Sequence, residues 1–365
     1  MANGLAQLGC EVHFVTGVND AARFDSRVEL LRLPFLNVPI QASHFNVLLG
    51  QLLGGAFVHL KVREALAGDS YDIVHGNTNS GSAFSLTWAS QEGSKSVFTV
   101  HNTTPWSGRN VRSAQQSIRR ATFRLLDAPL LRSVDRLVAL SASSAEELTR
   151  LYAVPPARIV TVPLGVDTDL FRPDLDTSKV LPKYRLEPGY VLAVGRLVDQ
   201  KGFGDFVRAF QGTRAVGVLV GDGPNYHSLK RLADRLLSPR QLTFLRSVPP
   251  GDLPALFSSA SAYVFTSLAE GLPAVGVEAL ASGLPVVAMR APGVIDLIEP
   301  SKNGLLTAAG DAKALGTSLQ QLLDDGNLRR AMGSVSRSMA IERYSWPSIA
   351  SRTLEVYSAA LAAPR

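Results

Sequence analysis

Short apolar runs alternate along the chain with segments whose apolar residues recur at helical spacing. In the first half, runs typical of buried strands occupy residues 11–16, 73–75, 96–101, 136–140 and 159–162. In the second half they occupy residues 190–194, 216–220, 242–245, 262–266 and 285–288. Helical periodicity falls between many of them, for example at 143–152, 204–211, 225–236 and 312–323. This alternation predicts an α/β fold whose parallel sheets carry helices on both faces.

A stretch rich in aspartate and proline, residues 166–188, interrupts the pattern. It has no clear period, which is typical of a linker. We therefore predict two doubly wound, Rossmann-like domains facing a cleft, one over residues 1–165 and one over 189–340. In such sheets, ligands bind at the carboxyl ends of the strands.

The beginning of the chain departs from this scheme. Residues 2–8 resemble the end of a helix, which Gly9 terminates before the strand at 11–16. A doubly wound domain is expected to open with a strand and a Gly-rich turn. We expect this first strand and its turn to be absent, through a misplaced start codon or a truncated chain.

Composition narrows the class of protein. The chain has 365 residues, of which 46% are hydrophobic, and this suffices for two cores. Its formal net charge of +6 is modest for this length and does not require nucleic acid as a partner. The single cysteine, Cys10, excludes an intrachain disulfide and favours a reducing compartment.

Neither a signal peptide nor a membrane span is expected. The first ten residues carry no positive charge. Residues 33–60 lack Asp, Glu, Lys and Arg, but histidines, glycines and amides interrupt them. They suggest a buried helix beside a cleft, or alternatively a loop that faces a membrane or an acceptor lipid. We expect a cytoplasmic protein.

Two cations follow the strand at 190–194. The strand ends at Gly195, Arg196 follows it in a loop, and Lys201 lies five residues after Arg196. Arg196 can bind a phosphate with two hydrogen bonds, and Lys201 adds a compact charge. Fixed cations of this kind stabilise a leaving nucleoside diphosphate without a metal. The alternative interpretation is two solvated cations on a loop.

Two carboxylates flank a predicted helix start in the second half. Pro273 suits the first turn of a helix that continues to about Ala281, with Glu270 before it and Glu278 within it. If all of 270–278 were helical, the carboxylates would lie about 12 Å apart, whereas a preceding loop lets both reach one ligand. Carboxylates accept hydrogen bonds from sugar or ribose hydroxyls. Alternatively, Glu270 caps the helix and Glu278 is a surface charge.

Three weaker signals complete the candidates. Gly221 and Asp222 form a Gly-rich turn after the strand at 216–220, which suits close approach of a ligand or a plain strand-to-helix turn. His101 ends another strand and is either a sugar contact or a structural histidine. Asp-x-Asp pairs at 167–169 and 174–176 lie in the predicted linker, and we expect no metal there.

A basic stretch lies between residues 95 and 136. Some of its arginines recur at helical spacing, which is typical of a helix on anionic lipid at the inner membrane face or of an ordinary solvated helix. Aromatic interleaving is absent, so nucleic acid is not expected. The candidates for membrane contact are Arg109, Arg112, Arg119, Arg120 and Arg124.

Together these motifs resemble the retaining group 1 glycosyltransferases (family 4), which have the GT-B fold. The motifs that carry the resemblance are Gly195-Arg196 with Lys201-Gly202, Gly221 to Pro224, Glu270 to Glu278, Asn303-Gly304, Arg343 to Trp346 and Val162 to Asp167. The segment 341–365 is similar to the family's C-terminal helix, which crosses back to the first domain.

The resemblance implies a role for each candidate. Arg196 and Lys201 would hold the diphosphate of a UDP- or GDP-linked sugar, Glu278 would bind the ribose, and His101 would touch the donor sugar from the first domain. Glu270 and the backbone that follows it would hold the donor sugar. The residues that the resemblance assigns to the donor are Gly195, Gly221, Asp222, Gly271, Leu272, Pro273, Ala274, Val275 and Glu278. The reaction would retain the anomeric configuration and need no metal or other cofactor, and the acceptor would be a glycan, a lipid or a small molecule.

Two substitutions depart from the family pattern. Leu164 stands where Asn is usual, and Arg246 stands where Gly is frequent, near the base pocket. Together with the expected missing strand, they leave three alternatives open: a non-catalytic GT-B protein that binds nucleotide-sugar, a sugar-nucleotide epimerase of the same fold, and a glycoside hydrolase that uses the two glutamates.

Overall fold

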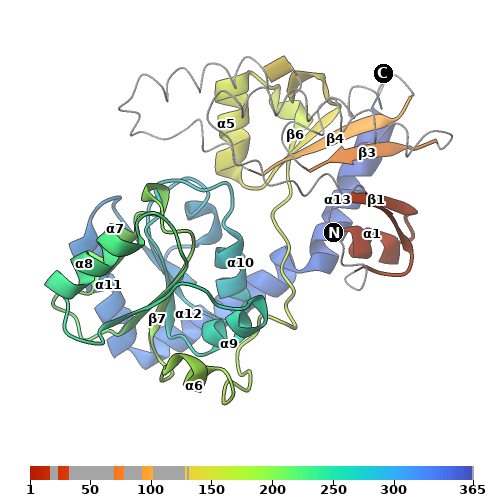
Figure 1. Ribbon diagram of the computed structural model, residues 1–365. Coiled ribbons are helices and arrows are strands. Elements are labelled where there is room, and N and C mark those ends of the chain that lie inside the picture. The colour runs from red at the N-terminus through yellow and green to blue at the C-terminus, as the bar shows by residue number, and fades with distance from the viewer. Residues whose placement is uncertain (17–23, 33–69, 78–92, 102–127, 130, 364–365) are drawn as a thin grey trace. The chain divides into compact units, whose positions relative to one another are not determined.

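A computed structural model describes residues 1–16, 24–32, 70–77, 93–101, 128–129 and 131–363 (Figure 1). The chain divides into two compact units. The first comprises residues 1–163 and 346–365, and the second comprises residues 164–345. The two units are described separately.

The first unit contains parallel strands only, within the ranges described. Strands β1 (Val12–Thr16) and β2 (Val28–Arg32) pair with each other beside α1 (Ala2–Gln7). A four-stranded sheet has the order β3-β4-β5-β6. Its strands are β3 (Ile73–Gly76), β4 (Lys95–Val100), β5 (Arg136–Ala139) and β6 (Ile159–Thr161).

Helices pack on both faces of this sheet. On one face, Leu148 and Tyr152 of α5 (Ala142–Tyr152) join Phe98 and Leu137 in the core. The opposite face packs against α13 (Trp346–Ala362), which is the last helix of the chain. The residues of this second core are Val97, Val138, Val162, Ile349, Val356 and Ala360.

The second unit is built on a six-stranded parallel sheet with the order β12-β11-β10-β7-β8-β9. The strands are β7 (Val191–Val194), β8 (Gly217–Val220), β9 (Leu242–Leu245), β10 (Ala262–Phe265), β11 (Val286–Met289) and β12 (Gly304–Thr307). The strand that comes first in this unit, β7, lies between β8 and β10. The chain therefore builds outward from β7 in both directions, and this reversal is where doubly wound sheets bind ligands.

Helices cover both faces of the second sheet. On one side of β7, Figure 1 shows α7 (Phe203–Ala209), α8 (Tyr226–Leu236) and α11 (Ala312–Asp324), whose apolar residues share one core. The other helices of this unit are α6 (Leu181–Tyr184), α9 (Leu253–Ser258), α10 (Ala274–Ala281) and α12 (Gly326–Met339). Residues 191 and 193 of β7 join the α7 core, while Leu192 points to the opposite face, as strand alternation requires.

Ten predicted strands are present with ends shifted by at most one residue. Among the strands that the structure describes, β2 and β12 were missed, and both lie at the edge of their sheets. The segment 166–188, which we predicted as a linker, lies within the second unit. It is anchored there because the Phe171 ring packs edge-on against Phe257, and because Arg337 donates to the carbonyls of Thr168 and Phe171.

Candidate functional site

The loops after β7 and β10 are bonded to each other at the point where the second sheet reverses. The Thr266 hydroxyl donates to the carbonyl of Lys201 over 2.9 Å. The Leu268 amide donates to the Gln200 carbonyl over 2.8 Å, and the Gln200 side-chain amide donates to Ala269 over 2.9 Å. Three hydrogen bonds therefore fix the position of one loop relative to the other.

Glycine is required where these loops approach most closely. Gly202 has a φ of +62°, and a Cβ atom built on it would lie 2.1 Å from the carbonyl oxygen of Thr266. No side chain fits at that distance, and the positive φ is also unfavourable for other residues. The conformation at Gly202 places the side chain of the preceding residue, Lys201, at the loop junction.

Lys201 and Glu270 form an ion pair across this junction. The Lys201 Nζ donates to Oε1 of Glu270 over 2.5 Å, and their side chains are only 18% and 10% exposed. An ammonium group has three protons, so Lys201 retains donors for a further anion. The pair holds that cation at the carboxyl end of β7.

Helix α10 begins close to this ion pair with an open N-terminus. Pro273 precedes the first turn, and its side chain has no hydrogen-bond acceptor that could cap the helix. Its carbonyl accepts from the amides of Gly276 and Val277. In the part of the chain that the structure describes, the amides of Ala274 and Val275 have no hydrogen-bond partner. Free amides at the positive end of a helix dipole form a ready anion site.

The buried segment before α10 is held from the other side. Gly271, Leu272 and Pro273 are buried. The Glu270 amide donates to the carbonyl of Pro292 over 2.9 Å, and a Cβ on Gly293 would lie 2.3 Å from the Glu270 carbonyl. The loop after β11 therefore fills the space on that side of Glu270.

Glu278 is a desolvated carboxylate on α10. Burial raises the pKa of Glu278 to about 7, and within the described residues no hydrogen bond or ion pair satisfies its side chain. A carboxylate without a protein partner is available to hydroxyl donors of a ligand. The prediction that Glu270 precedes the helix and Glu278 lies inside it is confirmed by the bounds of α10.

Tyr263 links the two carboxylates to the end of β7, and sequence reasoning missed it. Its side chain is buried, and its hydroxyl lies 3.2 Å from both the amide and the carbonyl of Val194. Burial, followed by the nearby charges of Glu278 and Glu270, raises the pKa of Tyr263. A tyrosine in a buried strand was the available signal, since its hydroxyl must find a polar partner.

Arg196, in the loop after β7 that also carries Lys201, is exposed. Its guanidinium has no hydrogen bond or ion pair among the residues that the structure describes. The adjoining Gly195 is in tight contact with Gly221, because a Cβ on Gly221 would lie 1.9 Å from the Gly195 carbonyl oxygen. The turns after β7 and β8 are thus in close contact. This contact requires glycine at position 221, which has no Cβ atom and adopts a φ of +144°.

Asp222 has a protein partner of its own. Its carboxylate accepts from Arg246 over 2.9 Å, and this hydrogen bond is the main reason why the pKa of Asp222 is lowered. Arg246 follows β9, so the turns after β8 and β9 are joined as well. The assignment of Asp222 to donor binding gains no support from this ion pair.

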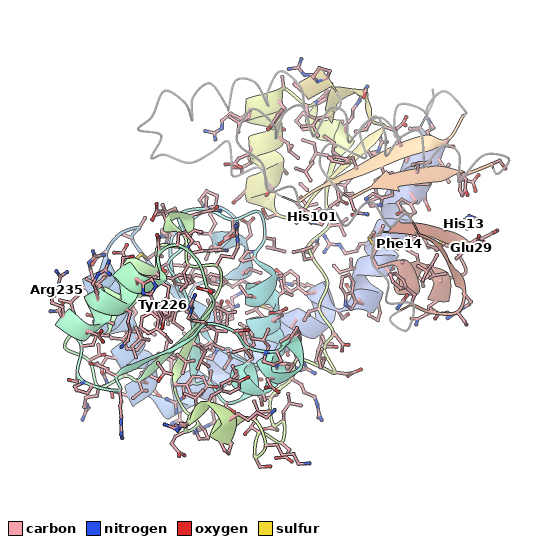
Figure 2. All side chains as sticks on the ribbon, in the orientation of Figure 1. His13, Phe14, Glu29, His101, Tyr226 and Arg235 are labelled. Carbon is pink, nitrogen blue, oxygen red and sulfur yellow. The ribbon has the colours of Figure 1, made fainter. Side chains whose placement is uncertain are left out.

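Two histidines of the first unit, His75 and His101, lie at the carboxyl ends of β3 and β4. Figure 2 shows the position of His101. His101 is exposed, and partial desolvation lowers its pKa. His75 is enclosed by Tyr357 and Thr99, which lie 2.6 Å and 2.7 Å from its two ring nitrogens. Burial, assisted by the charge of His101, lowers the pKa of His75 to about 4, so His75 is neutral at pH 7 and fixes α13 to the sheet.

Several other candidates have simpler explanations or cannot be placed. Asp167 accepts from the amides of Asp169 and Leu170, and Asp176 accepts from Ser178, so these carboxylates stabilise turns. The segment 33–60 and the five arginines proposed for membrane contact lie outside the described residues. Among the helices that are described, none has the length and hydropathy needed to cross a bilayer.

Comparison with known proteins decides the family. The profile of glycosyl transferases group 1 matches residues 178–339, and that of glycosyltransferase family 4 matches residues 1–170. The chain belongs to the group 1 glycosyltransferases. The predicted membership of the group 1 glycosyltransferases and the α/β fold class are thereby confirmed, whereas retention of configuration stays a prediction, and the solved relatives share the GT-B fold.

Individual relatives of this glycosyltransferase are distant. It is 27% identical to the MMP alpha-(1->4)-mannosyltransferase of Mycolicibacterium hassiacum over 99% of this chain and 93% of that one. It is 32% identical to a GDP-mannose-dependent phosphatidylinositol monomannoside mannosyltransferase of Mycolicibacterium smegmatis, over 56% of this chain and 57% of that one.

Two solved structures, each 23% identical to this chain, share its fold. The sucrose-phosphate synthase of Thermosynechococcus elongatus has a TM-score of 0.81, and the superposition covers 100% of this chain and 92% of that one. Anabaena HepE in complex with UDP and glucose has a TM-score of 0.71, covering 91% and 86%.

Proposed function

We propose that this glycosyltransferase transfers a hexose from a UDP- or GDP-linked donor to a glycan, lipid or small-molecule acceptor. The reaction retains the anomeric configuration, as the family resemblance implies, and uses no metal. One observation carries the proposal: the Lys201–Glu270 pair, the Arg196 guanidinium and the open N-terminus of α10 adjoin the reversal point of the second sheet.

The diphosphate is proposed to lie against the cations and the helix start. Negative charge grows on the leaving diphosphate as the bond to the sugar breaks. Lys201 can donate the protons that do not bond to Glu270, and Arg196 can donate from its guanidinium group. Ala274 and Val275 can donate from their backbone amides. Because Lys201 and the α10 amides are held in place beforehand, they stabilise the transition state without reorganisation.

The donor's hydroxyls are proposed to bind the carboxylates. Glu278 lacks a protein partner and is desolvated, so binding to ribose hydroxyls would replace the hydration that folding removed. Glu270 is fixed by Lys201 and keeps a second oxygen for the donor sugar. For His101, in the first unit, we propose a contact with the donor sugar, and this assignment depends on the family resemblance alone.

Names of relatives support a nucleotide-linked donor. One relative is described as GDP-mannose-dependent, and Anabaena HepE has been solved with UDP and with UDP-glucose. These properties belong to those proteins. For this chain they select GDP-mannose and UDP-glucose as the first donors to assay.

The test is a panel of nucleotide-sugars that includes these two, with release of nucleoside diphosphate as the readout. Turnover of at least one donor, with a product whose anomeric configuration by NMR matches that of the donor, is the expected result. The same assay runs in excess EDTA to examine metal independence. Binding of a nucleotide without any turnover would favour the non-catalytic alternative, and turnover of a simple glycoside without nucleotide would favour the hydrolase.

A further inference from the structure

A planar cluster lies at the carboxyl ends of β8 and β9. Arg246 donates to Asp222 through Nε and through one terminal nitrogen, with distances between 2.9 and 3.2 Å. The guanidinium carbon lies 4.6 Å from the centroid of the Tyr226 ring. Tyr226 is the first residue of α8, and its ring packs edge-on against Phe244 of β9 at 5.9 Å.

These contacts fix the plane of the guanidinium. Tyr226 covers one face, and Asp222 engages one edge. The Arg246 side chain is nevertheless 53% exposed, so a large part of it remains accessible to a ligand. An exposed ion pair by itself adds little to stability. What this one achieves is to hold a planar, exposed cation in place over the Tyr226 ring, and a guanidinium is suited to stacking.

The cluster lies on the side of the site that remains open. Neighbouring strands are about 4.8 Å apart, so β9 lies about 10 Å from β7, where Gly195 and Arg196 are found. In the other direction, Gly293 packs against the Glu270 carbonyl. The space beside the Glu270 carbonyl is thus filled, whereas the base of a nucleoside diphosphate bound at Arg196 and Lys201 can extend toward β8 and β9.

We propose that Arg246, held flat by Tyr226 and Asp222, is the platform on which the base of the nucleoside diphosphate stacks. The inference rests on the proposed function, because it assumes that a diphosphate binds at Lys201 and Arg196. Every base has a π-face, and stacking on an aromatic ring or a guanidinium is tolerant of base identity. The platform therefore strengthens binding of nucleotides in general over binding of phosphate groups alone.

The experiment measures dissociation constants by calorimetry for GDP, UDP and inorganic pyrophosphate. Arg246→Ala is expected to weaken whichever nucleotides bind by about tenfold, within the range that stacking of one base supplies. Arg246→Lys, which keeps the charge and loses the plane, is expected to behave like Arg246→Ala. Tyr226→Phe keeps the ring and is expected to retain wild-type affinity, whereas pyrophosphate affinity is expected to be the same in all variants.

Arg235 provides the matched control. It is an exposed arginine near the opposite end of α8 from Tyr226 (Figure 2), and Arg235→Ala is expected to leave all three constants unchanged. An equal loss of nucleotide and pyrophosphate affinity in Arg246→Ala would mean that Arg246 acts only as a charge, and would overturn the platform. Unchanged nucleotide affinity would overturn it as well. If the wild-type protein binds neither GDP nor UDP, both the proposed function and the platform fail together.

Discussion

The ammonium nitrogen of Lys201 lies 2.5 Å from Oε1 of Glu270, although the two residues are 69 positions apart in the chain. Each lies in a loop that follows a strand, and those strands, β7 and β10, are neighbours in the sheet. The pair therefore joins the cation that we propose for the diphosphate to the carboxylate that we propose for the donor sugar.

Replacing Lys201 by Ala is expected to lower kcat by about 10²–10³, because a fixed donor to the leaving diphosphate is lost. Steady-state kinetics with the donor found in the panel measure this. Lys183→Ala is the control, since Lys183 forms another lysine–carboxylate pair, with Asp252, at 3.2 Å on the exposed surface. Equal kinetics in both variants would remove Lys201 from the mechanism.

Glu278→Gln is expected to stabilise the protein at high pH. The pKa of Glu278 is about 7 in the folded state against 4.5 for an ordinary glutamate, so the folded protein holds a proton that the unfolded chain has released between those values. The wild type consequently loses stability as pH rises from 4.5 to 7, by about 3 kcal/mol at most, and the cost remains above pH 7. A glutamine at this position stays neutral, so the variant does not lose this stability.

Thermal unfolding of both proteins at pH 5 and pH 8 measures this effect. The advantage of Glu278→Gln is expected to be larger at pH 8, together with weaker nucleotide binding. Glu146→Gln, at an exposed position of α5, is the control. A stability difference that does not change with pH would show that the Glu278 carboxylate is solvated.

Gly202→Ala is expected to destabilise the protein more than Gly212→Ala. Both glycines have positive φ, +62° and +78°, so both variants carry a backbone penalty of about 1–2 kcal/mol. Only at Gly202 does the added Cβ meet an atom, the Thr266 carbonyl at 2.1 Å, whereas nothing lies within 4 Å at Gly212. Urea unfolding compares the two.

The same pair of variants tests the junction of the loops. Gly202→Ala pushes the loops after β7 and β10 apart, so nucleotide affinity is expected to fall, while Gly212→Ala is expected to keep it. Similar unfolding free energies in the two variants would contradict the close approach at Gly202.

Tyr357→Phe is expected to destabilise the first unit and to leave nucleotide affinity intact. The variant removes the hydroxyl that lies 2.6 Å from Nδ1 of the buried His75, and an unsatisfied buried polar group costs about 1–3 kcal/mol. Thermal unfolding and calorimetry with nucleotide measure the two outcomes. An unchanged unfolding midpoint would mean that His75 does not anchor α13.

The sequence by itself determined the strands of the second unit and the elements that carry the candidate residues. Buried parallel strands are continuous apolar runs, so Val191–Val194 and Ala262–Phe265 could be located to within a residue. Turn chemistry placed Glu270 before α10 and Glu278 within it, because Pro273 and Gly283 mark the ends of that helix. The edge strand Gly304–Thr307 begins with glycine and is only partly buried, and it escaped the same reasoning.

Only the tertiary structure decided which of these residues meet. Strand order follows from how the helices bury both faces of the sheet, and no spacing along the chain reveals that β7 lies beside β10. The Lys201–Glu270 pair, the Tyr263 hydroxyl on Val194 and the Arg246 guanidinium on Tyr226 all depend on this order. The raised pKa of Glu278 does so too, because desolvation is a property of the packed environment and not of the residue.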